Sequence, residues 1–112
     1  LAPPQLTHTR HGQKTAPFSK KAERYGTLAF AKSLLNDQDW FEGLWVNKTS
    51  IENKPILFIW GMKDSFIGPS YLDQFKSGFT NASVVQLPGC GHFPQDEEAA
   101  ESLKAMQTFL SP

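Results

Sequence analysis

The distribution of apolar residues in the second half of the chain predicts two buried strands joined by a helix. A nearly continuous apolar run, bounded by a proline and a glycine, is typical of a strand that is covered on both faces and predicts a strand at 56–60. A shorter apolar run predicts a second strand at 83–87. Between them, Pro69 stands in the first turn of a helix that we expect to end near Lys76. A strand, helix, strand order predicts two parallel neighbouring strands joined by a crossover.

Upstream of these strands, the spacing of apolar residues predicts two helices. The first covers 17–35, with Ser19 as its N-cap. Its apolar face consists of four residues, Leu28, Ala31, Leu34 and Leu35. The second covers 37–46 and carries an apolar strip wide enough for a core face, made of Trp40, Phe41, Leu44 and Trp45. Residues 1–16 are polar, contain prolines and show no period, so we expect an irregular arm there.

The last segment predicts an amphipathic helix at 95–110. Its first turn is acidic, which suits the positive end of a helix dipole, and we expect these three residues to be solvated rather than to bind a metal. They are Asp96, Glu97 and Glu98. The buried seam of the helix is predicted to consist of Leu103, Met106, Phe109 and Leu110.

Two titratable residues come directly after the predicted strands. Asp64 follows the first strand, and His92 follows the second in a turn between Gly91 and Phe93. Because open α/β sheets build their sites at the carboxyl ends of the strands, we expect the two side chains to meet there. A carboxylate that accepts one ring N–H of a histidine fixes its tautomer and leaves the other ring nitrogen to act as a general base. The pattern therefore predicts a catalytic pair of Asp64 and His92.

These residues and their neighbours also have structural interpretations. Asp64 can be a turn former after a strand. Cys90 stands two positions from His92 and suggests a thiol nucleophile, but neighbouring turn residues rarely face each other, so a small, partly buried residue is the simpler interpretation. His8 and His11 fall in the irregular arm, where we expect them to be solvated.

The segment 54–112 resembles the last two strands and last two helices of an α/β-hydrolase. Trp60-Gly-Met-Lys-Asp64 is similar to the acid motif of that family, and Gly91-His92-Phe-Pro is similar to its histidine motif. The resemblance implies an α/β fold class: a partial α/β-hydrolase with two parallel strands, a crossover and C-terminal helices, plus helices from the end of a cap. It assigns catalytic roles to Asp64 and His92. No Gly-x-Ser-x-Gly nucleophile elbow occurs in the 112 residues, so we expect this chain to be inactive alone.

Three stretches of the upstream half are Ala16-Pro-Phe-Ser, Arg24-Tyr-Gly and Asp39-Trp-Phe-Glu-Gly-Leu-Trp45. Through them, the segment 17–53 resembles the end of the helical cap of haloalkane dehalogenases and related epoxide hydrolases. This resemblance implies hydrolysis of a small apolar substrate, with an Asp or Ser nucleophile supplied by an N-terminal half. The candidate substrate-contacting residues are Trp40, Trp45 and Phe93. For the two tryptophans, the resemblance implies that a cap tryptophan N–H can bind a leaving halide. Packing is the alternative role for such an aromatic strip.

Composition limits the classes of partner. Eleven basic and eleven acidic residues cancel, so no excess charge attracts nucleic acid or an anionic membrane. No apolar run approaches the ~20 residues of a membrane helix, and the start lacks the apolar core of a signal peptide, so we expect a cytoplasmic protein. A single cysteine and the lack of zinc-type spacing predict no disulfide, metal or cofactor.

A sheet of two strands has edges that need partners. Parallel strands occur almost only in larger, doubly covered sheets, so we expect the first strand to pair with a complementary chain or with a second copy. The start at Leu1 rather than Met also fits a fragment. The alternative function is therefore a free-standing, non-catalytic module that serves assembly or partner binding.

Overall fold

The computed structural model describes residues 13–112 and divides them into two units. One unit comprises residues 13–51 and is helical, whereas the other comprises residues 52–112 and contains the sheet. The boundary follows Ile51, two residues before the boundary predicted after residue 53. The expectations for His8 and His11 lie outside the described residues.

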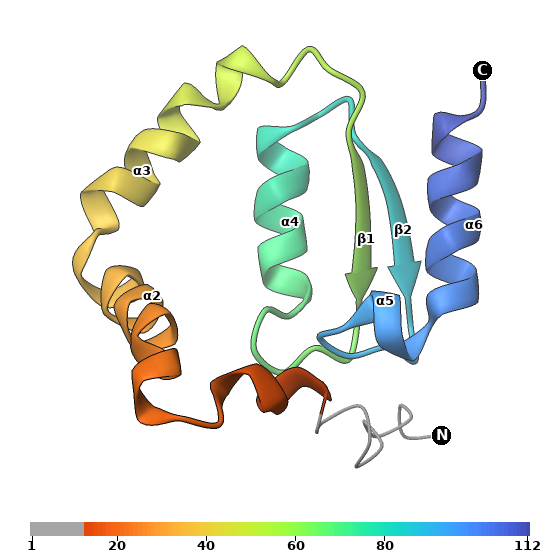
Figure 1. The fold of residues 1–112 in the computed structure, drawn as a ribbon. Coiled ribbons are helices and arrows are strands. Elements are labelled where there is room, and N and C mark those ends of the chain that lie inside the picture. Colours follow the sequence, from red (N-terminus) through yellow and green to blue (C-terminus); the bar gives the residue numbers. More distant parts are fainter. Residues whose placement is uncertain (1–12) are drawn as a thin grey trace. The chain divides into compact units, whose positions relative to one another are not determined.

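The sheet consists of two parallel strands. Strand β1 (Leu57–Gly61) pairs with β2 (Ser83–Leu87) in a register that places Leu57 opposite Ser83. Helix α4 (Pro69–Gly78) makes the crossover between them and has Pro69 in its first turn (Figure 1). The α/β class, the parallel pairing and the helical crossover are confirmed.

Two helices cover opposite faces of this sheet. Helix α4 lies on the face that carries Phe58 and Trp60, whose rings lie 5.5 and 5.8 Å from the ring of Phe75. Helix α6 (Ala99–Leu110) lies on the other face (Figure 1). Both faces of the short sheet are therefore covered, as the apolar strand sequences require. The buried apolar side chains are Leu72, Phe79, Leu87 and Cys90.

The predicted helix at 95–110 is wrong in two respects. It is interrupted at Glu98, where φ is −133° and ψ is 54°, so that a single turn, α5 (Pro94–Glu97), precedes α6. In addition, the buried residue of α6 is Ser102, which is 3% exposed and donates to the carbonyl of Pro94, and the half-buried Ala105 and Phe109 line the space between α6 and the strands. Three of the four predicted seam residues are exposed: Leu103, Met106 and Leu110.

The predicted helix at 17–35 is also broken. Two short 3-10 helices, η1 (Ala16–Phe18) and η2 (Lys21–Arg24), precede α2 (Tyr25–Asn36). Side chains compensate for the break, because Arg24 donates to the carbonyls of Phe18 and Ser19, and Glu23 accepts from the Lys20 amide. Residues 13–15 are helical and Ala16 begins η1, so the prediction of an irregular arm is wrong for residues 13–16, and the rest of that prediction lies outside the described residues.

The helix predicted at 37–46 is confirmed as α3 (Gln38–Val46) and is followed by η3 (Asn47–Ser50). Its aromatic strip does not lie on a buried face. Trp40 is 62% exposed and Leu44 is 53% exposed, and the described residues of this unit include no buried side chain. The unit therefore has helical structure without a core of its own. Among the described residues, no helix has the length and apolarity to cross a bilayer.

Candidate active site

Asp64 is placed by a tight turn at the carboxyl end of β1. Its backbone N–H donates to the carbonyl of Gly61 at 3.1 Å. Carboxylate oxygen Oδ1 accepts hydrogen bonds from the amides of Phe66 at 2.8 Å and Ile67 at 3.0 Å. The side chain is only 8% exposed, and its second oxygen, Oδ2, points to His92. The turn-forming role and the catalytic role considered from the sequence are thus compatible in one residue.

His92 lies against Asp64, as the sequence predicts. Nδ1 of the imidazole is 2.7 Å from Oδ2 of Asp64, so an Nδ1–H donates to the carboxylate and Nε2 is the ring nitrogen that can take a proton. The ring contacts Phe93 edge-on at 4.9 Å and Phe66 at 5.8 Å between ring centroids. The side chain is 37% exposed, which leaves it accessible to a reacting group.

The surroundings of Asp64 favour its charged form. Burial by itself raises the pKa of this carboxyl, but the hydrogen bonds from Ile67, His92 and Phe66, together with the charge of His92, outweigh burial and lower the pKa below its ordinary value. The carboxylate is therefore ionised near neutral pH. An ionised carboxylate orients the imidazole and stabilises the imidazolium when His92 takes a proton.

Backbone contacts hold the two turns together beyond the ends of the strands. The amide of Met62 donates to the carbonyl of Leu87 at 3.0 Å, and the amide of Lys63 donates to that of Cys90 at 2.9 Å. Gly61 is required here because a Cβ at this position would overlap the carbonyl oxygen of Gly91. Main-chain hydrogen bonds thus join the Asp64 and His92 turns, in addition to the side-chain contact between the two residues.

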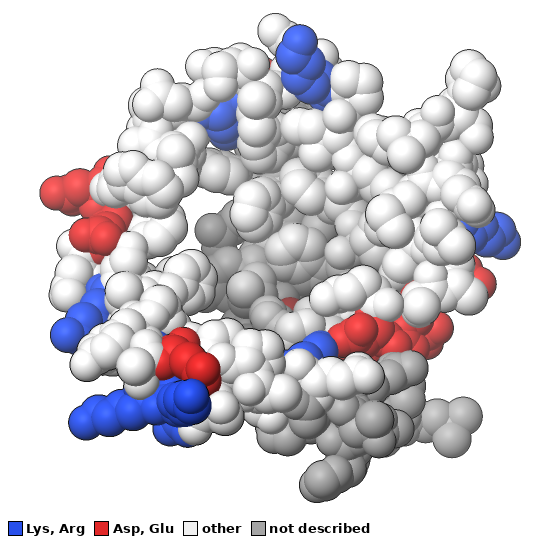
Figure 2. All heavy atoms as spheres, in the orientation of Figure 1, with Lys and Arg blue, Asp and Glu red and all other residues white. Residues whose placement is uncertain are grey.

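Glu97 is a residue of this site that the sequence analysis missed. The sequence predicts a solvated acid at this position, but the Glu97 carboxylate accepts hydrogen bonds from the amides of Gly91 at 2.7 Å and Phe93 at 3.3 Å. The available signal was the position of Glu97 in the first turn after Pro94, where an acidic side chain can bind backbone amides that precede the helix. Acidic side chains gather on the surface over α5 and the start of α6 (Figure 2): Asp96, Glu97, Glu98 and Glu101.

The structure supports the simpler interpretation of Cys90. Its side chain is fully buried. Burial, together with the charges of Glu97 and Glu98, raises the pKa of the thiol to about 11. A nucleophilic cysteine needs an accessible thiolate, so Cys90 is a packing residue.

The predicted substrate-contacting aromatics lie in different units. Phe93 is beside His92, whereas Trp40 and Trp45 are on α3 in the helical unit. Trp40 packs edge-on against Phe41 at 5.0 Å, and Nζ of Lys48 lies 5.8 Å from the ring centroid of Trp45. A substrate role for the three aromatics stays a prediction.

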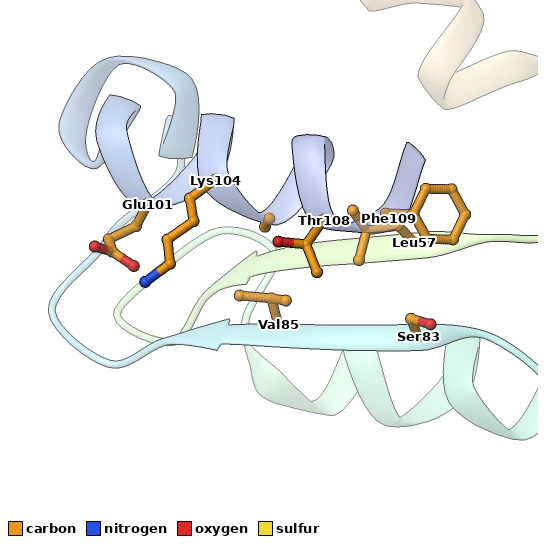
Figure 3. A pocket seen from close by; sticks show the side chains of 8 residues that line it. Leu57, Ser83, Val85, Glu101, Lys104, Thr108 and Phe109 are labelled. Atoms are coloured by element: carbon orange, nitrogen blue, oxygen red, sulfur yellow. The ribbon is translucent and has the colours of Figure 1, made fainter. Parts of the chain in front are cut away.

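A cavity of about 510 Å³ opens between α6 and the strands (Figure 3). It is lined by Leu57, Val85 and Phe109 among others, and neither Asp64 nor His92 borders it. The cavity is therefore separate from the candidate site. Within residues 13–112, no group of three or more His, Cys, Asp or Glu side chains is arranged to hold a metal ion.

Comparison with known proteins identifies relatives of this chain. Residues 2–99 match a family model described as alpha/beta hydrolase fold. A protein named "Putative hydrolase LipZ", present in two strains of Mycobacterium tuberculosis, is 41% identical over 57 residues, which are 51% of this chain and 20% of the relative. "Lipase 1" of Psychrobacter immobilis is 34% identical over 59 residues, or 50% of this chain and 19% of the relative. The matched part thus spans about a fifth of each relative's length.

Proposed function

The chain belongs to the alpha/beta hydrolase fold family, and on this premise we propose that it supplies the acid and the general base of a hydrolase. Asp64 is the acid and His92 is the base. The observation that carries this proposal is the 2.7 Å contact between Oδ2 of Asp64 and Nδ1 of His92, formed by residues that follow two different strands. The His92 ring is accessible, as a general base must be, and the Asp64 carboxylate that orients it is buried.

In the proposed mechanism, Nε2 of His92 takes a proton from a nucleophile or from an attacking water. Asp64 keeps its hydrogen bond to Nδ1, so it holds the ring in place and stabilises the positive charge that develops on it. The imidazolium then returns the proton to the leaving group. Neither residue attacks the substrate, and the nucleophile comes from a segment outside these 112 residues, which contain no Gly-x-Ser-x-Gly motif.

A carboxylic ester is the substrate class that we place first. One relative is named a lipase and another a hydrolase, and a serine nucleophile suits both names. A haloalkane, attacked by an aspartate nucleophile, is the second class. It is favoured by the two tryptophans of α3, Trp40 and Trp45, whose N–H groups can bind a leaving halide.

Complementation tests this function. The chain is mixed with the N-terminal half of a related hydrolase, and hydrolysis of p-nitrophenyl butyrate is measured, with halide release from 1-bromobutane measured in parallel. We expect ester hydrolysis from the mixture and none from either part alone. His92→Ala should abolish the activity, and Asp64→Asn should reduce kcat about 10³- to 10⁴-fold because the ring loses its orienting carboxylate.

Asp73→Asn is the matched control, because it makes the same chemical change on the exposed surface of α4. This variant should retain the activity of the unsubstituted chain. An activity that persists in His92→Ala would refute the proposal, and halide release without ester hydrolysis would replace the substrate class.

A second candidate function, a non-catalytic assembly module, is favoured by the sheet edge. Among residues 13–112, β1 pairs only with β2, so its other edge has no neighbouring strand. The carbonyl of Ile56 and the amide of Met62 both bond toward β2. Because backbone direction alternates along a strand, the N–H of Leu57 faces the open edge, where a complementary chain or a second copy can pair with it.

Light scattering over a concentration series tests this second function. Self-association through the edge predicts a molar mass that rises from 12.5 kDa toward a dimer at micromolar concentration. Leu57→Pro removes one edge donor at the first strand position, where proline is tolerated, and should weaken association. Circular dichroism of the same variant verifies its fold. A strictly monomeric chain that melts cooperatively would exclude self-association.

A further inference from the structure

The carboxylate of Glu97 joins the two backbone amides on either side of His92. Oxygen Oε2 accepts from the amide of Gly91 at 2.7 Å, and Oε1 accepts from the amide of Phe93 at 3.3 Å. Both amides belong to a part-buried turn, so their hydrogen bonds are not simply replaced by water. Hydrogen bonds to an ionised carboxylate are also stronger than bonds between neutral groups.

Backbone hydrogen bonds close the turn that carries Glu97. The amides of Asp96 and Glu97 both donate to the carbonyl of Phe93 at 2.9 Å, so the chain after His92 folds back onto the residue that follows it. Oγ of Ser102 donates to the carbonyl of Pro94 at 3.1 Å, and Ser102 is 3% exposed. A buried residue of α6 therefore anchors the turn that positions Glu97.

The backbone at Gly91 lies close to the Glu97 carboxylate. A Cβ placed on Gly91 would lie 3.1 Å from Oε1 and 3.2 Å from Oε2 of Glu97, closer than side-chain carbons normally approach. Glycine at position 91 thus lets the carboxylate reach the backbone. Gly91, which precedes His92, and Glu97, which follows His92 by five residues, therefore act as one structural unit.

We propose that Glu97 is a positioning residue for His92. By fixing the amides of Gly91 and Phe93, it holds the backbone of His92 at the position from which Nδ1 reaches Oδ2 of Asp64. Glu97 acts through the main chain and takes no proton. The catalytic meaning of this role rests on the proposed hydrolase function, whereas the positioning itself is a property of this chain.

Proton NMR of the 112-residue chain tests the role without any substrate. The Nδ1–H of His92 should give a low-field ring resonance, identified by its loss in Asp64→Asn. Glu97→Gln retains the size of the side chain but replaces one acceptor oxygen with an NH2 donor, which cannot accept from the amide that the lost oxygen served. We expect exchange of this ring proton with water to become at least about tenfold faster.

Glu98→Gln is the matched control, since it removes the same charge one residue further along the chain and should leave the ring resonance unchanged. Equal effects of the two variants, or an unchanged resonance in Glu97→Gln, would overturn the proposal. If Glu97→Gln does not fold, amide exchange in the unsubstituted chain decides. Slow exchange at both Gly91 and Phe93 supports the proposal, and fast exchange at both refutes it. Because no measurement uses substrate, the outcome is independent of whether the complemented enzyme hydrolyses esters.

Discussion

The Asp64 carboxylate uses its two oxygens for different purposes. Oδ1 holds the local turn through the amides of Phe66 and Ile67, and Oδ2 holds His92. One side chain therefore completes its own loop and orients a residue from another loop. This double use explains why the carboxyl stays ionised in spite of its burial: three hydrogen bonds outweigh the loss of water.

The lowered pKa of Asp64 gives a pH dependence with a definite sign. The ordinary pKa is 3.8 and the folded value is lower, so the unfolded chain binds more protons between these two values and the free energy of unfolding rises with pH there. The contribution of Asp64 is complete above the ordinary value and is lost as the pH falls through the folded value.

Asp64→Asn should therefore lower the free energy of unfolding by about 1–3 kcal/mol at pH 7, since it removes hydrogen bonds to a charged group. The difference from the unsubstituted chain should shrink as the pH falls below 3.8, because protonation of the unfolded chain reduces the contribution of the charged carboxylate. Urea titrations at pH 7 and pH 3 measure this, with Asp73→Asn as the control. The same difference at both pH values would contradict the assigned role.

At the scale of elements, the site depends on how closely two strand-to-helix turns approach. The ladder of β1 and β2 continues through the amides of Met62 and Lys63, and Gly61 provides the clearance for the turn at Gly91. The helices stabilise the site through packing and hydrogen bonds, and the proposed catalytic groups come from the turns. α4 packs under the aromatic face of β1, and α6 anchors α5 through Ser102.

Gly61→Ala tests this close approach. The added methyl overlaps the carbonyl of Gly91, so the His92 turn must shift, and we expect a loss of about 1–3 kcal/mol in stability. Gly89→Ala is the matched control, because a Cβ there has no atom within 4 Å, and its effect should stay within about 0.5 kcal/mol. Thermal and urea unfolding of both variants provide the comparison. Equal stability of the two variants would refute the steric argument.

At the scale of the whole molecule, the two units differ in how much they bury. The unit of residues 52–112 contains all the buried side chains of the described chain, whereas residues 13–51 contain none. Helices without a buried face gain little from tertiary packing, which normally provides most of their stability. The helical unit should therefore open more readily than the unit that carries the Asp64–His92 pair.

Limited trypsin digestion tests this difference. Early cleavage is expected at Lys20, Arg24, Lys32 and Lys48 in the helical unit, at least about tenfold faster than at Lys63, Lys76 and Lys104. Mass spectrometry of a time course should show the fragment that begins after Lys48 persisting to late times. Simultaneous loss of both units would indicate that the helical unit is as stable as the sheet unit.

The sequence by itself determined the strands, their parallel crossover, and the pair of Asp64 and His92. These features follow from apolar runs of strand length and from turn residues at fixed places, which are local properties of the chain. The contact between the pair was predictable because the carboxyl ends of neighbouring parallel strands share one edge of a sheet.

Only the tertiary structure decided the contacts of Glu97, the buried face of α6 and the breaks in the helices. An acidic side chain in a first helical turn is normally solvated. Glu97 instead accepts hydrogen bonds from the amides of Gly91 and Phe93, and this contact depends on where α6 anchors the turn. Likewise, hydrophobicity pointed to Leu103 and Met106, which are exposed, whereas the buried residue of α6 is Ser102, which donates to the carbonyl of Pro94. Hydrophobic periodicity locates an apolar strip on a helix, but it contains no information about which side of that helix a neighbouring turn and the sheet will cover.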